Sequence, residues 1–256
     1  MKVFYRISDK GNPKEKIPSA DKFGCLQNAI REFGKDEIYV IADNCSSKTL
    51  DHLEEIGIRF EVTTLGNSGS FVYVARLIVN TVQEDELVYL LEDDYIHLPG
   101  ASKLLQEGLT LADYVTLYDH PDKYIAFNEH GNPFNFNRLH PTRLMVTKNS
   151  HWATINSTTM TFACRVKTLK EDLPIWEKYT ESRNPKDFHA FVELSQNGII
   201  DAFSFLFLQK KKLFFKLIMK NRLCGKKMRK IISSIPARAT HAEVKWLAPV
   251  IDWDSI

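Results

Sequence analysis

Short apolar runs and longer amphipathic stretches alternate along the first 118 residues. An apolar run of about five residues favours a strand, whereas apolar residues spaced three and four apart favour a helix. The pattern predicts strands at 3–7, 38–42, 58–62, 87–91 and 113–118, and helices at 22–33, 48–56, 71–82 and 99–109. This order predicts an α/β fold with a mostly parallel central sheet and helices on both faces.

Capping residues mark the ends of the first two predicted helices. Asp21 is expected to cap the helix that stops before Gly34, and Ser47 to cap the helix that stops before Gly57. Residues 64–70 are predicted to form a loop of small residues that leads into the third helix. Ligands of such sheets bind beyond the carboxyl ends of the strands, so this loop belongs to the expected binding crevice.

The regular alternation ends near residue 118. Beyond that point the pattern predicts strands at 143–147 and 158–163, helices at 168–179 and 186–197, and an ordered coil at 231–256. We expect one domain over residues 1–256, with a regular part at 1–118 and a less regular part at 119–256.

The most informative motif is the acidic triplet that ends the predicted strand at 87–91. Glu92, Asp93 and Asp94 follow five apolar residues directly. Three adjacent carboxylates repel one another unless a positive group lies among them. Oxygen-rich sites of this kind suit Mg²⁺ or Mn²⁺, while the alternative is a solvated acidic turn.

Composition sets broad limits on the class of protein. The 256 residues are 44% hydrophobic and 26% charged, as in ordinary globular proteins. The four cysteines are scattered without a Cys-x-x-Cys pair, so neither a zinc site nor a disulfide framework is indicated. The chain has no signal-peptide pattern and no run of about 18 apolar residues, and we therefore expect a cytoplasmic protein.

The net charge of +2 hides an uneven distribution, because ten basic residues and no acidic one lie between 210 and 230. Within residues 203–230, Lys212, Lys216 and Lys220 form one stripe of a helical wheel and apolar residues form another. A basic amphipathic helix is typical of peripheral contact with an anionic membrane, and the alternative is a docked helix with a solvated face. No nucleic-acid-binding motif accompanies these charges, so nucleic acid is not an expected partner.

Five short stretches, in order, resemble the GT-A class of glycosyltransferases, which use nucleotide diphosphate sugars. They are Val3–Asp9, Ile41–Asn44, Asn67–Ser70, Leu91–Tyr95 and Thr240–His241. More narrowly, the chain resembles small GT-A-like enzymes of large algal viruses and some bacteria, and the resemblance covers roughly residues 1–120 in order. It implies a Rossmann-like GT-A fold with a nucleotide-sugar-binding half at 1–118 and an acceptor half at 119–256.

The resemblance assigns roles to the acidic triplet. Glu92-Asp93-Asp94 is similar to the Asp-x-Asp signature of the class, with Glu in place of the first Asp. It implies that Asp94 binds the cation bridging two phosphates and that Glu92 or Asp93 faces the ribose or the donor sugar. Many members use a late histidine as a further metal ligand, and His241 fits that role because imidazole is a suitable ligand for Mn²⁺.

More donor contacts are implied where the first two strands end. Arg6, Ser8 and Asp43 lie at positions that hold the base and ribose in GT-A proteins. A carboxylate accepts hydrogen bonds from base N–H groups or ribose hydroxyls. For Asp43 the alternative is an Asx turn before Ser46.

The small residues Asn67, Gly69 and Ser70 are the remaining expected donor contacts. Small side chains let the backbone approach a ligand closely, and a helix start offers N–H groups to an anion. The alternative is that Ser68 or Ser70 only caps the helix. Arg76, further along this helix, either reaches a phosphate or solvates a helix face.

The acceptor half supplies the expected base. An inverting transferase needs a carboxylate to take the acceptor hydroxyl proton, and in the GT-A class this residue begins a late helix. Asp187 fits best and Glu193 less well, the alternative for Asp187 being an acid that stabilises a helix start. His151, Trp152 and Thr158 are candidate acceptor contacts, with core packing as the alternative for Trp152.

These patterns predict a glycosyltransferase that depends on Mn²⁺ or Mg²⁺. It would move a hexosyl or deoxyhexosyl group, with inversion, from a UDP- or GDP-type sugar to a glycan or lipid-linked hydroxyl. One alternative is a non-catalytic module that binds membranes or polyanions through residues 210–230. Another is a metal-dependent nucleotidyltransferase, which the lack of a Gly-rich loop with Arg or Lys after the first strand argues against.

Overall fold

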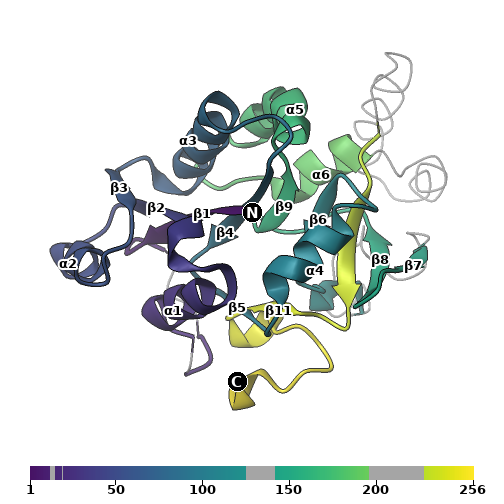
Figure 1. Cartoon of the computed structure of the whole chain (residues 1–256). Coiled ribbons are helices and arrows are strands. Elements are labelled where there is room, and N and C mark those ends of the chain that lie inside the picture. Colours follow the sequence, from purple (N-terminus) through teal and green to yellow (C-terminus); the bar gives the residue numbers. More distant parts are fainter. Residues whose placement is uncertain (12–14, 19, 125–141, 196–227) are drawn as a thin grey trace, which may run out of the picture.

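The computed structural model describes residues 1–11, 15–18, 20–124, 142–195 and 228–256. Their strands form a nine-stranded sheet in the order β3-β2-β1-β4-β9-β6-β10-β8-β7 and a two-stranded sheet of β11 and β5 (Figure 1). The strands are β1 Lys2–Ser8, β2 Ile38–Asp43, β3 Phe60–Thr63, β4 Leu87–Glu92, β5 Tyr95–His97, β6 Tyr114–Thr116, β7 Leu144–Val146, β8 His151–Ile155, β9 Phe162–Arg165, β10 Ile231–Ile235 and β11 Ala239–His241.

The larger sheet is mixed but mostly runs in one direction. Strands β3, β2, β1 and β4 pair in parallel, as do β6 and β10. Strand β9 is antiparallel to both β4 and β6, so β6 and β10 point the same way as β1–β4. The carboxyl ends of all these parallel strands therefore share one edge of the sheet. The predicted α/β class with a mostly parallel sheet is confirmed.

Helices cover both faces of the sheet (Figure 1). They are α1 Lys22–Phe33, α2 Ser47–Glu55, α3 Gly66–Thr81, α4 Ala101–Gly108, α5 Val166–Tyr179 and α6 Asp187–Ser195. Helices α1, α2 and α4 pack in one buried apolar cluster, and α3, α5 and α6 pack in the other. Strand β1 contributes to both clusters, because Val3 and Tyr5 face one and Phe4 faces the other. This double burial explains the continuous apolar runs of the central strands.

The observed N-terminus matches the prediction at one helix, α1, and differs from it at α2 and α3. Asp21 caps α1, since its Oδ1 accepts the Gly24 N–H at 2.6 Å. At α2 the N-cap is Ser46, one residue before the predicted Ser47. Helix α3 starts at Gly66, so the predicted loop at 64–70 is mostly the first turn of that helix.

The C-terminal residues differ most from their prediction. Residues 231–256 were expected to be coil, but β10 pairs with β6 and β8 inside the large sheet. Strand β11 pairs with β5, and residues 15–18 lie beside it through the Lys16–Glu243 bridge. These pairings bring the end of the chain back to the carboxyl edge of β4.

Most of the basic segment at 203–230 lies outside the described residues, and so does its predicted amphipathic helix. In the parts of the chain that are described, none of the helices combines the length and apolar character needed to cross a bilayer.

Candidate functional site

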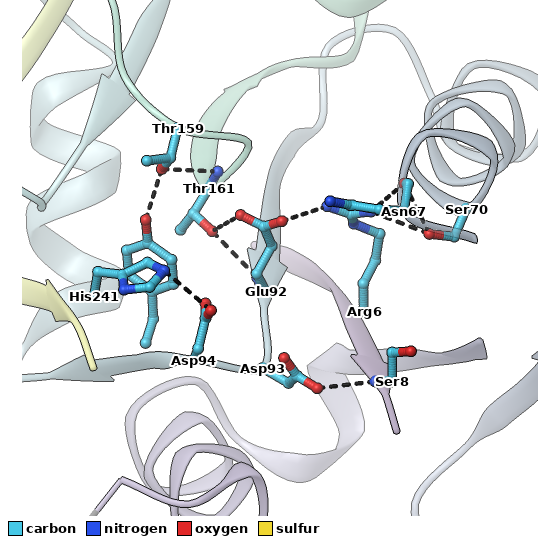
Figure 2. Close-up of polar contacts among 11 residues, drawn as sticks. Arg6, Ser8, Asn67, Ser70, Glu92, Asp93, Asp94, Thr159, Thr161 and His241 are labelled. Carbon is cyan, nitrogen blue, oxygen red and sulfur yellow. Dashed lines mark hydrogen bonds and ion pairs between the residues drawn. The ribbon is translucent and has the colours of Figure 1, made fainter. Parts of the chain in front are cut away.

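The shared carboxyl edge of β1, β2 and β4 gathers the residues singled out in the sequence. Parallel register places Ser8 opposite Asp43 and Arg6 opposite Glu92. Figure 2 shows the acidic triplet with Arg6 and the start of α3 on one side and His241 on the other. The residues expected to line a crevice at this edge therefore form one cluster of interacting side chains.

Arg6 connects the acidic triplet to the start of α3. Its Nη2 donates to Glu92 Oε1 at 2.7 Å, and its Nη1 donates to the Asn67 carbonyl at 2.8 Å and to Ser70 Oγ at 3.1 Å. The guanidinium also lies 5.5 Å from the centre of the Phe71 ring, and the side chain is 7% exposed. Arg6 thus neutralises one carboxylate of the triplet and ties it to α3.

The second oxygen of Glu92 faces a run of hydroxyl residues. Thr161 Oγ1 is 3.5 Å from Glu92 Oε2, and it accepts the Glu92 N–H at 3.2 Å. Nearby, Thr159 Oγ1 and the Tyr95 hydroxyl are 2.7 Å apart (Figure 2). The loop before β9 therefore forms a hydroxyl-lined wall beside the acidic tip.

Asp93 is held against the end of β1. Its Oδ2 accepts the Ser8 N–H at 2.8 Å. Burial raises the pKa of Asp93 to about 6, and the neighbouring Asp94 adds to this while the Ser8 N–H and Lys16 oppose it. A carboxyl of this kind gains from a nearby cation, because the cation restores its ionised form.

Asp94 and His241 meet although they lie far apart in the chain. Pairing of β11 with β5 puts His241 opposite Tyr95, and His241 Nε2 lies 3.0 Å from Asp94 Oδ2. The Ala242 N–H also donates to the Asp94 carbonyl at 2.7 Å. The His241 and Asp94 side chains are mostly buried, at 12% and 18% exposure, so the pair is held in place and still reachable.

The donor set of this pair fits a divalent cation. Neighbouring ligands of an octahedral ion bound at about 2.1 Å lie about 3.0 Å apart, which matches the His241 Nε2–Asp94 Oδ2 separation of 3.0 Å. Within the described residues there is no group of three or more His, Cys, Asp or Glu side chains that could hold a metal. One or two protein ligands are usual where phosphates of a substrate complete the shell of Mg²⁺.

The ring of His241 has a defined starting tautomer. Its Nδ1 accepts the Glu243 N–H at 3.2 Å, so in the neutral ring Nε2 carries the proton and donates to Asp94. A cation on Nε2 requires that proton on Nδ1 instead, and the Glu243 contact would then open.

Asp187 begins α6, as the sequence predicted. Burial raises its pKa to about 6, the Phe188 N–H opposes this, and the negative charges of Glu92 and Asp122 raise it further. Asp187 therefore lies within electrostatic range of the acidic tip. Glu193 is 5% exposed and accepts hydrogen bonds from Lys178 and Tyr179, so its carboxylate has a structural role in α6.

Asp43 makes contacts within the protein that the sequence did not predict. Its carboxylate accepts from Thr63 Oγ1 at 2.8 Å and from the N–H groups of Leu65 and Gly66 at 2.6 and 2.9 Å. The side chain is 3% exposed. Asp43 thus caps the start of α3, and the expected Asx turn toward Ser46 is not the bond it makes. Its contact with a ribose stays a prediction.

The first turn of α3 also has structural reasons for its small residues. A Cβ on Gly69 would meet the Leu65 Cβ at 2.9 Å, so glycine permits a close approach within the protein. Asn67 and Ser70 hold Arg6, and the N-cap is Leu65, so neither Ser68 nor Ser70 is the cap. Donor contacts by these residues stay predictions.

The remaining candidate residues differ in their exposure and in their contacts. Trp152 is fully buried and donates to Thr147 Oγ1 at 3.0 Å, which agrees with core packing, the alternative to an acceptor contact. Thr158 is buried at 7% exposure in the loop that carries Thr159. His151 is exposed at the start of β8, beside β7. Arg76 pairs with Glu177 on α5 rather than reaching the site.

Sequence reasoning missed a second polar cluster next to the site. His120 and Asp122 follow β6 in the turn η2 Pro121–Lys123, with His120 Nδ1 2.8 Å from Asp122 Oδ1. The His120 ring lies 5.1 Å from the Tyr118 ring and 5.2 Å from the Trp246 ring. The signal was available as Asp-His-Pro-Asp directly after a predicted strand, at the carboxyl edge where ligands bind.

Comparisons with known proteins give distant likenesses only. No family model and no curated protein matches the chain. A solved CMP:2-keto-3-deoxy-manno-octonic acid synthetase complexed with CTP has a TM-score of 0.45 and 10% identity, covering 91% of this chain and 88% of its own. Galactosyltransferase LgtC, in complex with donor and acceptor sugar analogs, has a TM-score of 0.41 and 11% identity, and the match covers 91% of this chain and 86% of LgtC.

Residues 1–349 of TarS from S. aureus have a TM-score of 0.43 and 14% identity, covering 88% of this chain and 72% of that one. Likeness at this level assigns no activity to the chain, so its function is argued from the site alone.

Proposed function

We propose that the chain is a metal-dependent glycosyltransferase. It would move a hexosyl or deoxyhexosyl group from a UDP- or GDP-type nucleotide sugar to a hydroxyl of a glycan or lipid-linked acceptor, with inversion. The observation that carries this proposal is the meeting of Asp94 and His241 at 3.0 Å, at the sheet edge where Arg6 and Glu92 also lie. The His241 ring packs 5.2 Å from the Tyr95 ring, which holds its Nε2 beside Asp94.

Charge balance supports a cation at this point. Arg6 neutralises Glu92, while burial and the neighbouring Asp94 raise the pKa of Asp93, so an added positive charge beside these two carboxylates would be stabilising. Asp94 and His241 would hold Mn²⁺ or Mg²⁺ there. When bound, the ion would supply electrostatic stabilisation of the negative charge that develops on a departing diphosphate.

The chain's own residues would bind and orient the donor. The Asp93 carboxylate lies at the end of β1, where the Ser8 N–H holds one oxygen, and it is placed to accept ribose hydroxyls. Glu92 and Thr161 present oxygens to the same space. Arg6 would hold Glu92 in place, because its Nη2 donates to Glu92 and its Nη1 donates to Asn67 and Ser70.

Asp187 would take the acceptor proton. Its carboxylate would accept the hydrogen of the attacking hydroxyl as the oxygen bonds to the anomeric carbon and the diphosphate leaves with the bonding electrons. A base works best with a pKa near the working pH, and burial raises the pKa of Asp187 to about 6.

The proposal is tested first by binding. Thermal unfolding would be followed with nucleoside diphosphates and sugar nucleotides of each base, with and without Mn²⁺. A ligand at 100 times its dissociation constant adds about 2.7 kcal/mol of stability. Stabilisation that needs both the nucleotide and Mn²⁺, and that is lost in Asp94→Ala but kept in the control Asp51→Ala on the exposed face of α2, supports the proposal. Equal stabilisation in Asp94→Ala contradicts it.

Nucleotidyl transfer is the second candidate, and Lys16 favours it. This residue follows β1 and forms a backbone β-bridge with Glu243. Its charge lowers the pKa of Asp93, so a cation lies near the acidic tip. A triphosphate offers more charge for such a cation than a diphosphate sugar. The products distinguish the two reactions: pyrophosphate and a sugar nucleotide arise from nucleotidyl transfer, whereas a nucleoside diphosphate arises from glycosyl transfer.

Peripheral membrane contact through 210–230 is a separate proposal, since that segment lies almost wholly outside the described residues. Sedimentation with anionic liposomes, with and without residues 210–227, measures it. Binding that needs the segment, without any turnover of sugar nucleotides, favours the non-catalytic membrane module over the transferase.

A further inference from the structure

A cavity of about 340 Å³ lies at the edge of the sheet opposite the acidic triplet. It is placed where β6 and β10 begin and where the antiparallel β9 ends, so it is separate from the crevice at the carboxyl ends. Its volume falls in the range of small-molecule sites. The lining residues are Leu109, Ala112, Asp113, Arg165, Lys167, Thr168, Glu171 and Arg229.

Arg229 is the buried polar side chain of this cavity. It is 4% exposed, and it donates from Nε to Asp172 Oδ2 at 2.8 Å and from Nη2 to Glu171 Oε2 at 2.7 Å. Its Nη1 lies 3.5 Å from Asp113 Oδ1, yet within the described part of the chain this nitrogen has no hydrogen-bond acceptor. This nitrogen has almost no accessible surface, so the role of Arg229 is to position the carboxylates of Asp113 and Glu171, which line the cavity.

The mouth of the cavity is cationic. Arg165 and Lys167 are both exposed, and they flank the first residue of α5. The first turn of α5 contains no acidic residue, so its positive dipole end is not offset locally. The carbonyls of Glu86 and Glu84 already accept the N–H groups of Val166 and Lys167, so the helix contributes its dipole more than its donors.

Two acidic residues also line the cavity, the partly buried Asp113 and the exposed Glu171, so a simple inorganic anion is not the best ligand. Their carboxylates accept hydrogen bonds from hydroxyl groups. The cavity therefore offers cations for an anionic group at the mouth and acceptors for hydroxyls within. A molecule that carries both groups matches this arrangement.

We propose that this cavity binds a small phosphorylated sugar, with the phosphate at Arg165 and Lys167 and the sugar hydroxyls at Asp113 and Glu171. Arg229 holds these two carboxylates in place. The site is independent of the crevice, so it holds whether or not the chain transfers sugars.

Isothermal titration in EDTA tests the proposal, with glucose 1-phosphate, inorganic phosphate and glucose as separate probes. EDTA keeps a cation out of the crevice. We expect glucose 1-phosphate to bind more tightly than phosphate and glucose not to bind. The double variant Arg165→Gln/Lys167→Gln should weaken the binding of glucose 1-phosphate at least tenfold, because it removes both cations of the mouth. Both side chains are exposed, and Arg165→Gln also removes a hydrogen bond to the Asp85 carbonyl.

Two variants serve as controls. Lys170→Gln removes an exposed cation of the same helix that pairs with Glu84 outside the cavity, and it should bind glucose 1-phosphate like the unmodified chain. Asp94→Ala should bind it equally well, because Asp94 lies at the other edge of the sheet. Equal affinity in the double variant and the unmodified chain overturns the proposal, and so does loss of binding in Asp94→Ala or no binding of any probe.

Discussion

Asp187 carries a carboxyl group whose surroundings favour the neutral form. Burial is the main cause, and the charges of Glu92 and Asp122 add to it, so the pKa rises to about 6. If Asp187 is the base, the ionised form is active and the group is protonated below that pH. We therefore expect kcat/KM to fall tenfold per pH unit below about 6 and to level off above it.

Variants of the same region check this pH dependence. Asp187→Asn should lower kcat by about 10²–10⁴, the usual contribution of a general base, and should remove the acid limb from what activity remains. Glu181→Gln changes an exposed acid just before α6 and should leave the profile as it was. An unchanged acid limb in Asp187→Asn would show that another group titrates.

The lowered pKa of His97 affects the pH dependence of stability rather than that of activity. Its ring is buried beside Tyr89, whose hydroxyl lies 2.8 Å from Nε2, and burial lowers its pKa from 6.5 to about 3. The unfolded chain takes up a proton below pH 6.5 while the folded protein does not. Stability should therefore fall with decreasing pH between about 6.5 and 3, by up to about 1.4 kcal/mol per unit.

Urea unfolding of unmodified protein and His97→Gln at a series of pH values from about 7 down to about 4 isolates this contribution. The difference in unfolding free energy between the two should shrink as the pH falls, because the glutamine side chain does not titrate. His151→Gln alters an exposed ring and should keep the slope of the unmodified protein. A constant difference across the series would mean that His97 is protonated in the fold.

At the scale of single elements, Asp43 connects two strands to a helix. Its carboxylate at the end of β2 accepts from Thr63 in β3 and from Leu65 and Gly66 at the start of α3. Asp43→Ala leaves these buried donors unsatisfied, and each costs about 1–3 kcal/mol. We expect a loss of about 2–4 kcal/mol in unfolding free energy and faster amide exchange at residues 65–70.

The exposed acid Asp51 provides the comparison, because Asp51→Ala on α2 should change stability by less than about 0.5 kcal/mol. Asp43→Asn should lie between the two, since its amide oxygen still accepts one bond. If Asp43→Ala were as stable as Asp51→Ala, the capping role of Asp43 would be disproved.

The start of α3 also shows what sequence could and could not predict for an element. The helix body was predicted from its apolar spacing, which depends on local residues only. Its start was misplaced because the capping carboxylate, Asp43, lies 22 residues before Leu65 and is brought there by the sheet. Asp21, by contrast, caps from the adjacent position and was predicted correctly.

Strands β10 and β11 were missed for a related reason. Ile231–Ile235 contains two serines, and Ala239–His241 is only three residues long, so neither has a strong local pattern. Their partners, β6, β8 and β5, lie far away in the chain. The pairing is therefore a property of the folded sheet rather than of these segments.

At the scale of the whole molecule, the candidate site joins the two ends of the chain. Arg6 lies in the first strand and His241 in the last of the described strands, and both contact the acidic triplet of β4. The triplet was predictable because three carboxylates after an apolar run are locally unusual. The Arg6–Glu92 bond and the hydroxyl wall at Thr161 were not, because only the strand order β1-β4-β9 places them together.

Residues 248–253 support Thr240, the neighbour of His241, through two hydrogen bonds. Trp253 is 2% exposed and donates to the Ala248 carbonyl at 2.8 Å, and the Ala248 N–H donates to Thr240 Oγ1 at 2.8 Å. Trp253→Ala should cost about 3–5 kcal/mol from the lost packing. Amides of β11 should then exchange faster than those of β1, because the damage begins at the C-terminal segment.

The same variant should weaken the proposed Mn²⁺-dependent nucleotide binding, because Asp94 would lose its fixed partner. Val250→Ala is the matched control: Val250 is 87% exposed and has a positive φ of 79°, which alanine tolerates at least as well as valine, so the change should lower neither stability nor binding. Urea unfolding, hydrogen exchange and nucleotide titration with Mn²⁺ measure the three effects. Faster exchange at β11 with undiminished Mn²⁺-dependent affinity would mean that Asp94 holds a cation without His241, and the two-ligand site would have to be abandoned.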